Sequence, residues 1–248
     1  EAAGEAGFSR DVLVEAGLLG QKQETGSVYD RFRHRVMFPI ADRRGGVIAF
    51  GARAMDPEED AKYLNSPESS LFSKGRNLYG LGEAKEAIRS QGEAVIVEGY
   101  MDVIMAHQHG VDWVVGVLGT ALTEYHAREL KRLCDTVVLV FDADAAGQKA
   151  ASASLQVLLK EDLNIRVATL PSGLDPCDFL VEQGREPFVQ RLNQAEDFFN
   201  FKLAAARAQY GDVTVDGRQR VFEDLLPLAL APKNPVKREL LVRWIARE

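Results

Sequence analysis

The chain has 248 residues, of which 46% are hydrophobic and 27% are charged, and its formal net charge is −7. This composition is typical of a globular protein and excludes a disordered or low-complexity chain. No apolar run approaches the ~20 residues of a membrane-spanning helix, and no signal peptide is visible, so we expect no membrane partner. The two cysteines, Cys134 and Cys177, give no disulfide framework, which favours a reducing, cytoplasmic location, and together with the four histidines they have no zinc-binding spacing.

The first 91 residues predict a mixed α+β segment. Two apolar runs, residues 35–40 and 47–51, flank an Arg-Arg-Gly-Gly turn, a pattern that predicts a β-hairpin. Residues 63–82 have turn chemistry, and residues 83–90 predict a short helix. The first residue is Glu1 rather than methionine, so we expect a fragment of a longer protein.

The charge is distributed unevenly along the chain. Residues 28–55 hold six arginines and only two aspartates, whereas the acidic excess lies within residues 90–190. A basic stripe beside an acidic pocket suits a phosphate-bearing polymer better than the net charge suggests. A solvated charged face explains the charges alone equally well.

Residues 93–184 predict alternating strands and helices, which indicates βαβ units and a parallel sheet. A helix from about Thr123 to Leu133 has Thr123 as its N-cap, and a second helix covers about residues 145–159. From residue 187 onward we expect only helices, at residues 187–210, 216–230 and 235–247. The strands are expected at residues 94–97, 113–118, 136–141 and 165–170.

Acidic residues follow three of these strands. Glu98 follows the first, Asp142 and Asp144 follow the third, and Asp175 and Asp178 follow the fourth. Ligands of parallel sheets bind beyond the carboxyl ends of the strands, so these carboxylates should converge. Crowded carboxylates repel one another, and oxygen ligands suit Mg²⁺ or Mn²⁺. The residues alone therefore predict a magnesium-dependent enzyme that acts on phosphates.

Each acid also has a simpler explanation. Asp142 or Asp144 is placed to cap the following helix, and Asp175 before Pro176 is placed to initiate a turn. Asp102, in the first turn after Glu98, is either an outer ligand or a favourable charge at a helix N-terminus. These explanations account poorly for the same feature at three strand ends.

Four short motifs, three of which carry the acids, together resemble the TOPRIM domain of bacterial primases, topoisomerases and some nucleases. They are Glu98-Gly99-Tyr100-Met101-Asp102, Gly119-Thr120, Phe141-Asp142-Ala143-Asp144-Ala145-Ala146-Gly147 and Asp175-Pro176. Three flanking segments, residues 29–40, 62–68 and 72–80, look like the amino-terminal half of the catalytic core of bacterial DNA primases of the DnaG type.

This resemblance implies an α/β fold in three parts. A TOPRIM Rossmann-like parallel sheet core (residues 92–186) is flanked by a mixed α+β basic subdomain (1–91) and a helical subdomain (187–248). It also implies a nucleotidyltransferase, a DNA-directed RNA polymerase that joins ribonucleoside triphosphates into a short RNA primer on single-stranded DNA. The sequence has no zinc-ribbon motif, and we expect the replicative helicase to dock on a domain outside this chain.

The resemblance also assigns site residues. Glu98, Asp142 and Asp144 match the main acidic residues and are expected to be catalytic and to bind Mg²⁺ or Mn²⁺. Further metal ligands are expected at Asp175, Asp102 and Asp178. The residues expected to bind template and nucleotide phosphates are Lys62, Asn65, Lys74 and Arg76, together with Arg33 and Arg53.

One position departs from the family. An aspartate commonly stands two residues after Asp175, where this chain has Cys177, and a thiolate is a poor magnesium ligand. Either Asp178 substitutes through a shifted loop or the site has one acidic ligand fewer. Glu98 is either a metal ligand or the general base, and the sequence does not decide which.

Two other functions fit parts of the pattern. A TOPRIM topoisomerase or nuclease is one, but the candidate tyrosine nucleophiles, Tyr63, Tyr79 and Tyr100, all lie within the primase-like motifs. The other is a DNA-binding scaffold without chemistry, which Cys177 favours and the retention of all three main acids opposes.

Overall fold

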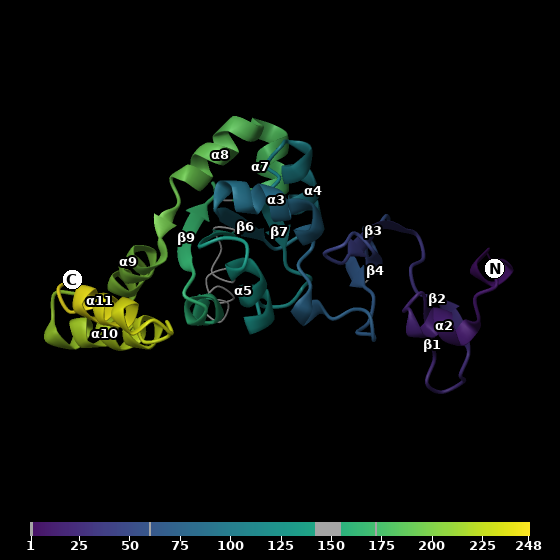
Figure 1. The fold of residues 1–248 in the computed structure, drawn as a ribbon, viewed down its shortest axis with the longest axis horizontal. Helices are drawn as coiled ribbons and strands as arrows, with labels where there is room; N and C mark the ends of the chain where they lie inside the picture. Colours follow the sequence, from purple (N-terminus) through teal and green to yellow (C-terminus); the bar gives the residue numbers. More distant parts are fainter. Residues whose placement is uncertain (1, 60, 142–154, 172) are drawn as a thin grey trace.

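A computed structural model describes residues 2–59, 61–141, 155–171 and 173–248. The N-terminal elements and the C-terminal helices lie at opposite ends of the molecule, with a parallel sheet between them (Figure 1). In the described ranges no helix has both the length and the apolar character required to span a bilayer.

The N-terminal part consists of short helices and two small antiparallel sheets. The predicted hairpin is confirmed, because β3 pairs with β4 and β4 pairs with β5. Asp42 shapes its turn by accepting the backbone N–H groups of Arg44 (2.8 Å) and Gly46 (2.9 Å) through Oδ1. The elements are α1 (Ala2–Glu5), α2 (Arg10–Glu15), β1 (Leu19–Gln21), β2 (Val28–Asp30), β3 (Arg35–Ala41), β4 (Val47–Ala54), β5 (Tyr63–Asn65) and the 3₁₀ helix η1 (Lys74–Arg76).

The central sheet has the strand order β10-β9-β8-β6-β7. The four strands predicted to form a parallel sheet do so through three parallel pairings, of β6 with β7, β6 with β8, and β8 with β9. Their side chains are largely buried, as expected for strands covered on both faces. The elements are α3 (Leu81–Gln91), β6 (Glu93–Val97), α4 (Tyr100–Gln108), β7 (Val114–Gly116), α5 (Glu124–Lys131), β8 (Thr136–Phe141), β9 (Asn164–Thr169) and α7 (Pro176–Gln183).

The helices around this sheet also agree with the sequence. The predicted N-cap of α5 is confirmed, because Thr123 Oγ1 accepts the backbone N–H of His126. Residues 155–160 are helical, which agrees with the end of the helix expected at residues 145–159. The remainder of that expected helix lies largely outside the described residues.

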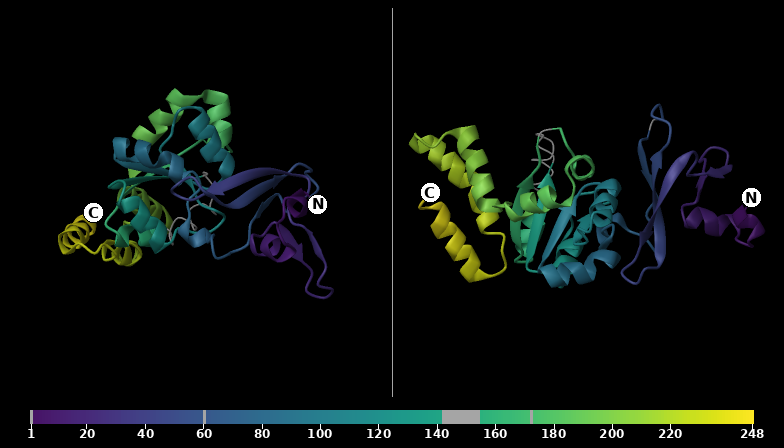
Figure 2. Two further views of the ribbon diagram at one scale, coloured as in Figure 1. Left: turned by 45° about the vertical axis from the view of Figure 1, so that its right-hand side comes forward. Right: turned by 90° about the horizontal axis from the view of Figure 1, so that it is seen from above.

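The C-terminal part is not purely helical, and the single helix predicted over residues 187–210 is wrong. Glu196 and Asp197 form a two-residue strand that pairs antiparallel with β9. Arg166 on β9 donates to the carbonyl oxygens of Asn193 (2.8 Å) and Ala195 (3.2 Å), and Asp197 caps the next helix. The elements are α8 (Arg185–Asn193), β10 (Glu196–Asp197), α9 (Phe198–Tyr210), α10 (Val215–Ala229) and α11 (Pro235–Ile245), which the two further views separate (Figure 2).

A small second core joins the N-terminal sheet to the central part. Tyr100, the first residue of α4, stacks on Phe38 of β3 with ring centroids 5.4 Å apart. A Cβ at Gly51 would lie 2.5 Å from Tyr100 Cζ, so β4 has glycine where the ring crosses it. This contact fixes β4 and β5 beside the start of α4, and hence beside the residues that follow β6. The buried members of this core are Phe38, Ile40, Ala49, Phe72, Tyr100 and Leu118.

Candidate functional site

A pocket of about 290 Å³ lies where the N-terminal sheet meets the central part. Five of the residues singled out from the sequence line it: Glu98, Asp102, Asp175, Lys62 and Asn65. The predicted convergence of strand ends is therefore confirmed for the acids that follow β6 and β9. The end of β8 reaches the same pocket through Val140. Asp142 and Asp144 lie outside the described residues.

Asp102 connects the two helices that carry the other acids. It is 7% exposed, and its Oδ2 accepts the backbone N–H of Gly99 (2.9 Å) while its Oδ1 accepts that of Cys177 (3.1 Å). Each carboxylate oxygen therefore binds a backbone amide near the N-terminus of a helix, α4 in one case and α7 in the other. Asp102 therefore links the start of α4 to the start of α7. In this way it positions Glu98, which precedes α4, relative to Asp175, which caps α7.

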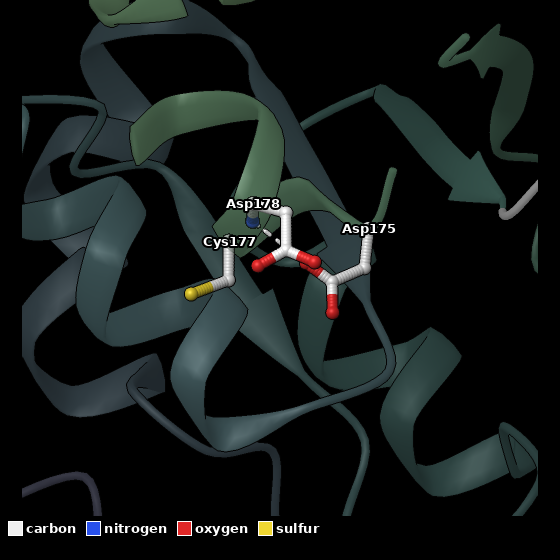
Figure 3. Close-up of side chains that lie close together, drawn as sticks. All are labelled: Asp175, Cys177 and Asp178. Carbon is white, nitrogen blue, oxygen red and sulfur yellow. Dashed lines mark hydrogen bonds between the residues drawn. The ribbon is translucent and has the colours of Figure 1, made fainter. Parts of the chain in front are cut away.

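Asp175, Cys177 and Asp178 form a compact cluster at the start of α7 (Figure 3). One ligand atom from each lies within 4.8 Å of the other two. Asp175 is the N-cap and accepts the backbone N–H of Asp178 at 2.7 Å, and Pro176 occupies the first turn. Asp178 therefore lies beside Asp175 at the start of α7.

The Cys177 thiol is poorly suited to a hard cation. Burial raises its pKa, and the neighbouring carboxylates of Asp175, Asp102 and Asp178 raise it further. The side chain therefore stays protonated at neutral pH, and it adds no negative charge to the cluster. The oxygen donors of Asp175 and Asp178 fit a divalent cation, and Toprim domains are a class that binds such ions.

Cationic side chains flank one aromatic ring at the edge of the pocket. Lys62 Nζ and Arg53 Cζ each lie 5.9 Å from the centroid of Tyr63. Burial raises the pKa of Tyr63, and the charge of Arg53 opposes that rise. Sequence reasoning assigned no binding role to this ring, although its place between Lys62 and Asn65 in a binding motif is a usable signal.

Asn65 joins the two sheets. Its Oδ1 accepts a hydrogen bond from Tyr100 Oη, and its Nδ2 donates to the carbonyl oxygen of Leu118 at 3.1 Å. Both ends of the amide are therefore engaged within the protein. Burial raises the pKa of Tyr100, so its hydroxyl stays protonated and donates, which is unlike an activated nucleophile.

The remaining predicted binding residues are not part of the pocket lining. Arg53 lies at the edge of the pocket beside Tyr63, and among the described residues Arg33, Lys74 and Arg76 do not line it. Lys74 and Arg76 belong to η1, which α5 holds in place: His126 Nε2 bonds the carbonyl oxygen of Lys74 (3.1 Å) and Thr123 Oγ1 donates to that of Gly75 (2.6 Å). Sequence reasoning missed His126, whose signal is its position three residues after the N-cap.

Three family models match successive parts of the chain. They are described as DNA primase catalytic core, N-terminal domain (residues 1–85), Toprim-like (95–180) and DnaB-helicase binding domain of primase (199–248). The last match corrects the expectation that helicase docking belongs only to a domain outside this chain. Residues 199–248 form helices without a recognisable motif, so the sequence pattern alone did not indicate that they bind a helicase.

Individual proteins agree with these matches. A DNA primase of Deinococcus radiodurans is 45% identical over 222 residues, which cover 89% of this chain and 39% of that protein. The chain therefore spans well under half the length of that relative. A DNA primase domain from Pseudomonas aeruginosa superposes with a TM-score of 0.90 at 37% identity, covering 96% of this chain and 75% of that structure. A DnaG primase catalytic domain bound to single-stranded DNA gives 0.86 at 38% identity, covering 96% and 77%.

The parallel sheet and the acids at its carboxyl edge define a Toprim-domain protein. The N-terminal part that packs against this domain matches the model of the N-terminal domain of the DNA primase catalytic core. With both parts matched in one solved structure, the chain belongs to the DnaG-type bacterial DNA primases.

Proposed function

We propose that this chain is the RNA-polymerising core of a primase. It would synthesise short RNA primers on single-stranded DNA by nucleotidyl transfer from ribonucleoside triphosphates. The observation that supports this most directly is the shared pocket, where Glu98 and Asp175 from the Toprim-like part face Lys62 from the N-terminal part. Carboxylates for a cation and a basic group for phosphates are the two requirements of this chemistry.

Glu98, Asp142 and Asp144 are the proposed principal metal ligands, with Asp175 and Asp178 as further oxygen donors. The proposed cation is Mg²⁺, which Mn²⁺ can replace. When bound, it would neutralise phosphate charge and lower the pKa of the attacking ribose 3′-hydroxyl. Lys62 and Arg53, which flank Tyr63, would bind the phosphates. Asp102 would hold the starts of α4 and α7 in fixed positions relative to each other.

The other proposed phosphate contacts are Lys74, Arg76 and Arg33, which lie outside the pocket.

Glu98 is exposed after β6, where either a ligand or a general base has access to the substrate. A Glu98→Gln variant separates these roles: loss of a general base flattens the acidic limb of the pH–rate profile, whereas loss of a ligand raises the metal concentration for half-maximal rate.

The decisive experiment is ribonucleotide incorporation by this chain on single-stranded DNA, with Mg²⁺ or Mn²⁺. We expect short template-dependent RNA, and none from the Asp142→Ala/Asp144→Ala variant. A matched control is Asp112→Ala/Asp216→Ala, which removes two exposed acids elsewhere. If a folded chain that binds Mn²⁺ makes no RNA even with the rest of the protein attached, the enzymatic proposal fails and a scaffold function replaces it.

Substitution of the family's common residue tests the metal cluster. Cys177→Asp adds a carboxylate beside Asp175 and Asp178, and metal affinity in such sites rises with ligand charge. We expect the dissociation constant for Mn²⁺, measured by titration calorimetry, to fall by roughly tenfold. Cys134→Ala, at the other free cysteine, should leave it unchanged. Equal affinities in the Cys177→Asp variant and the parent chain would remove this cluster from the metal site.

The proposed partners are a single-stranded DNA template, ribonucleoside triphosphates and the RNA primer. The replicative helicase joins them because residues 199–248 match the helicase-binding model. The division at residues 91/92 and 186/187 also stays a proposal. Two free cysteines support the proposed cytoplasmic location.

A further inference from the structure

A second pocket, of about 550 Å³, lies on the other side of η1 between α3, α5 and the β3–β4 turn. None of the functional assignments above explains it, although Arg76 of η1 belongs to its lining. Basic residues outnumber acidic ones there. The charged lining residues are Arg43, Arg44, Arg76, Lys85 and Arg89 against Asp42, Glu86 and Glu129. We refer to it as the α3–α5 pocket.

The three carboxylates of the α3–α5 pocket are engaged within the protein. Glu129 is 5% exposed and forms ion pairs with Arg43 and with Arg132. Glu86 pairs with Arg89 at 2.8 Å. The backbone N–H groups of the hairpin turn lower the pKa of Asp42, so this side chain stays ionised and committed to the turn. Neighbouring cations or backbone N–H groups therefore offset the negative charge of each acid, which weakens its repulsion of an incoming anion.

Three of the cations have no such commitment. Within the described part of the chain, Arg44, Arg76 and Lys85 form no ion pair within 4 Å. Lys85 Nζ makes a long hydrogen bond of 3.4 Å to the carbonyl oxygen of Arg43, which places it beside the turn. The α3–α5 pocket therefore has a surplus of positive charge that points to an anionic ligand.

An aromatic ring adds a second kind of contact. Arg76 Cζ lies 5.8 Å from the ring centroid of Tyr125, and this tyrosine is 43% exposed. Tyr125 and Glu129 are four residues apart on α5, so Arg76 and Arg43 contact successive turns on one face of this helix. Regularly spaced cations beside an exposed ring are the features that bind single-stranded nucleic acid without sequence preference.

The two pockets are connected by one short segment. Gly119 lines the pocket that holds Glu98, and Thr123, four residues later, holds η1 through its hydrogen bond to Gly75. This segment links a lining residue of the first pocket to η1, whose Arg76 lines the α3–α5 pocket.

We propose that the α3–α5 pocket is a binding site for the backbone and bases of single-stranded nucleic acid, beyond the catalytic pocket. This inference rests on the proposed function, because it assigns the pocket to the same template or its product. Arg44, Arg76 and Lys85 contact phosphates, and Tyr125 stacks on a base. Only strands long enough to leave the catalytic pocket use this site.

The test is fluorescence anisotropy of labelled single-stranded DNA, without metal or nucleoside triphosphates, so that it is independent of polymerisation. Oligonucleotides of about 6 and about 20 nucleotides are compared, since one site of this kind covers about 4–16 nucleotides. The variant is Arg44→Gln/Lys85→Gln, and the matched control is Arg191→Gln/Arg220→Gln, which removes two exposed cations elsewhere. Thermal unfolding of each variant verifies the fold.

We expect the test variant to bind the long strand roughly tenfold more weakly than the parent and the short strand equally well. The slope of log K against log salt should become shallower by about 1.4, because two phosphate contacts are lost. Tyr125→Leu should weaken binding of the long strand about fivefold without changing this slope.

Three results would overturn the inference. One is unchanged binding of the long strand in the test variant. Another is equal weakening for both lengths or in the control variant, which would indicate a general loss of charge. The third is a loss of affinity for free nucleoside triphosphate alone, which would make the pocket a nucleotide site. Failure of RNA synthesis with these binding results intact would refute the proposed function and leave this site standing.

Discussion

At the scale of single residues, the acids near the pocket divide into two kinds by what their oxygens touch. Asp102 binds a backbone N–H with each oxygen, whereas Asp175 uses one oxygen to cap α7. Glu98 is exposed at the end of β6. All three carboxylates look like metal ligands in the sequence, but their surroundings differ. Asp102 is buried and both of its oxygens accept backbone N–H groups, so it connects two segments of the backbone.

Replacement of Asp102 by asparagine measures how much this connection contributes to the free energy of unfolding. An amide has one acceptor oxygen, so one of the two backbone N–H groups would face an NH₂ group and lose its partner. We expect Asp102→Asn to lower the free energy of unfolding by about 1–3 kcal/mol in urea titration. Asp112→Asn, at an exposed turn, should change it by less than about 0.5 kcal/mol. Equal stability of the two variants would contradict the role given to Asp102.

At the scale of elements, η1 depends on a helix that is distant in sequence. Lys74 and Gly75 present their carbonyl oxygens to His126 and Thr123 at the start of α5. The N–H of Thr123 donates to Nδ1 of His126, so Nε2 carries the proton and donates to Lys74. This arrangement requires a neutral imidazole, and it holds η1, whose Arg76 lines the α3–α5 pocket.

The same ring predicts a pH dependence of stability. Burial lowers the pKa of His126 from 6.5 to about 4. Between these values the unfolded chain binds a proton that the folded chain does not, so the free energy of unfolding decreases as pH falls from 6.5 towards 4. The full loss is on the order of 3 kcal/mol.

Denaturant titrations at several pH values test this dependence. His126→Gln should be less stable at pH 7 but should lack this contribution to the acid sensitivity. His34→Asn, a change at an exposed residue with φ of 51°, should retain it. An unchanged pH profile in His126→Gln would assign the acid sensitivity to other groups.

At the scale of the whole molecule, the contacts between the C-terminal helices and the sheet include two sets of hydrogen bonds. β10 pairs with β9, and the start of α11 contacts the loop that precedes β9. Lys237 Nζ donates to the carbonyl oxygens of Asp162 (3.3 Å) and Leu163 (3.2 Å) and to Asn164 Oδ1 (3.0 Å). These contacts connect residues 199–248, which match the helicase-binding model, to the Toprim-like part.

Lys237→Met removes the Lys237 hydrogen bonds from the second of these sets. Its aliphatic part still packs, but three hydrogen bonds are lost, so we expect faster hydrogen exchange at the amides of α11 and little change in the central sheet. Arg220→Met, on the exposed face of α10, is the control and should not alter exchange in α11. Identical exchange in both variants would show that the Lys237 hydrogen bonds do not stabilise α11.

Local patterns in the sequence predicted much of this architecture. The hairpin around residues 42–46, the parallel strands and the Thr123 cap all follow from short-range periodicity and turn chemistry. The break at Glu196–Asp197 was not predictable in this way, because Arg166 and the edge of β9 produce it from far along the chain. The placement of Lys62 in the same pocket as Glu98 was anticipated only as a resemblance.

By itself, the sequence determined the strand ends that carry acids and the family to which the motifs point, since both depend on neighbouring residues. Only the tertiary structure decided which of those residues meet. It placed Asp102 under two helix N-termini, engaged the amide of Asn65 between two sheets, and separated Lys74 and Arg76 from the pocket of Glu98. These outcomes depend on long-range packing around Tyr100 and α5, because hydrogen bonds between distant segments form only after the sheet has set their positions.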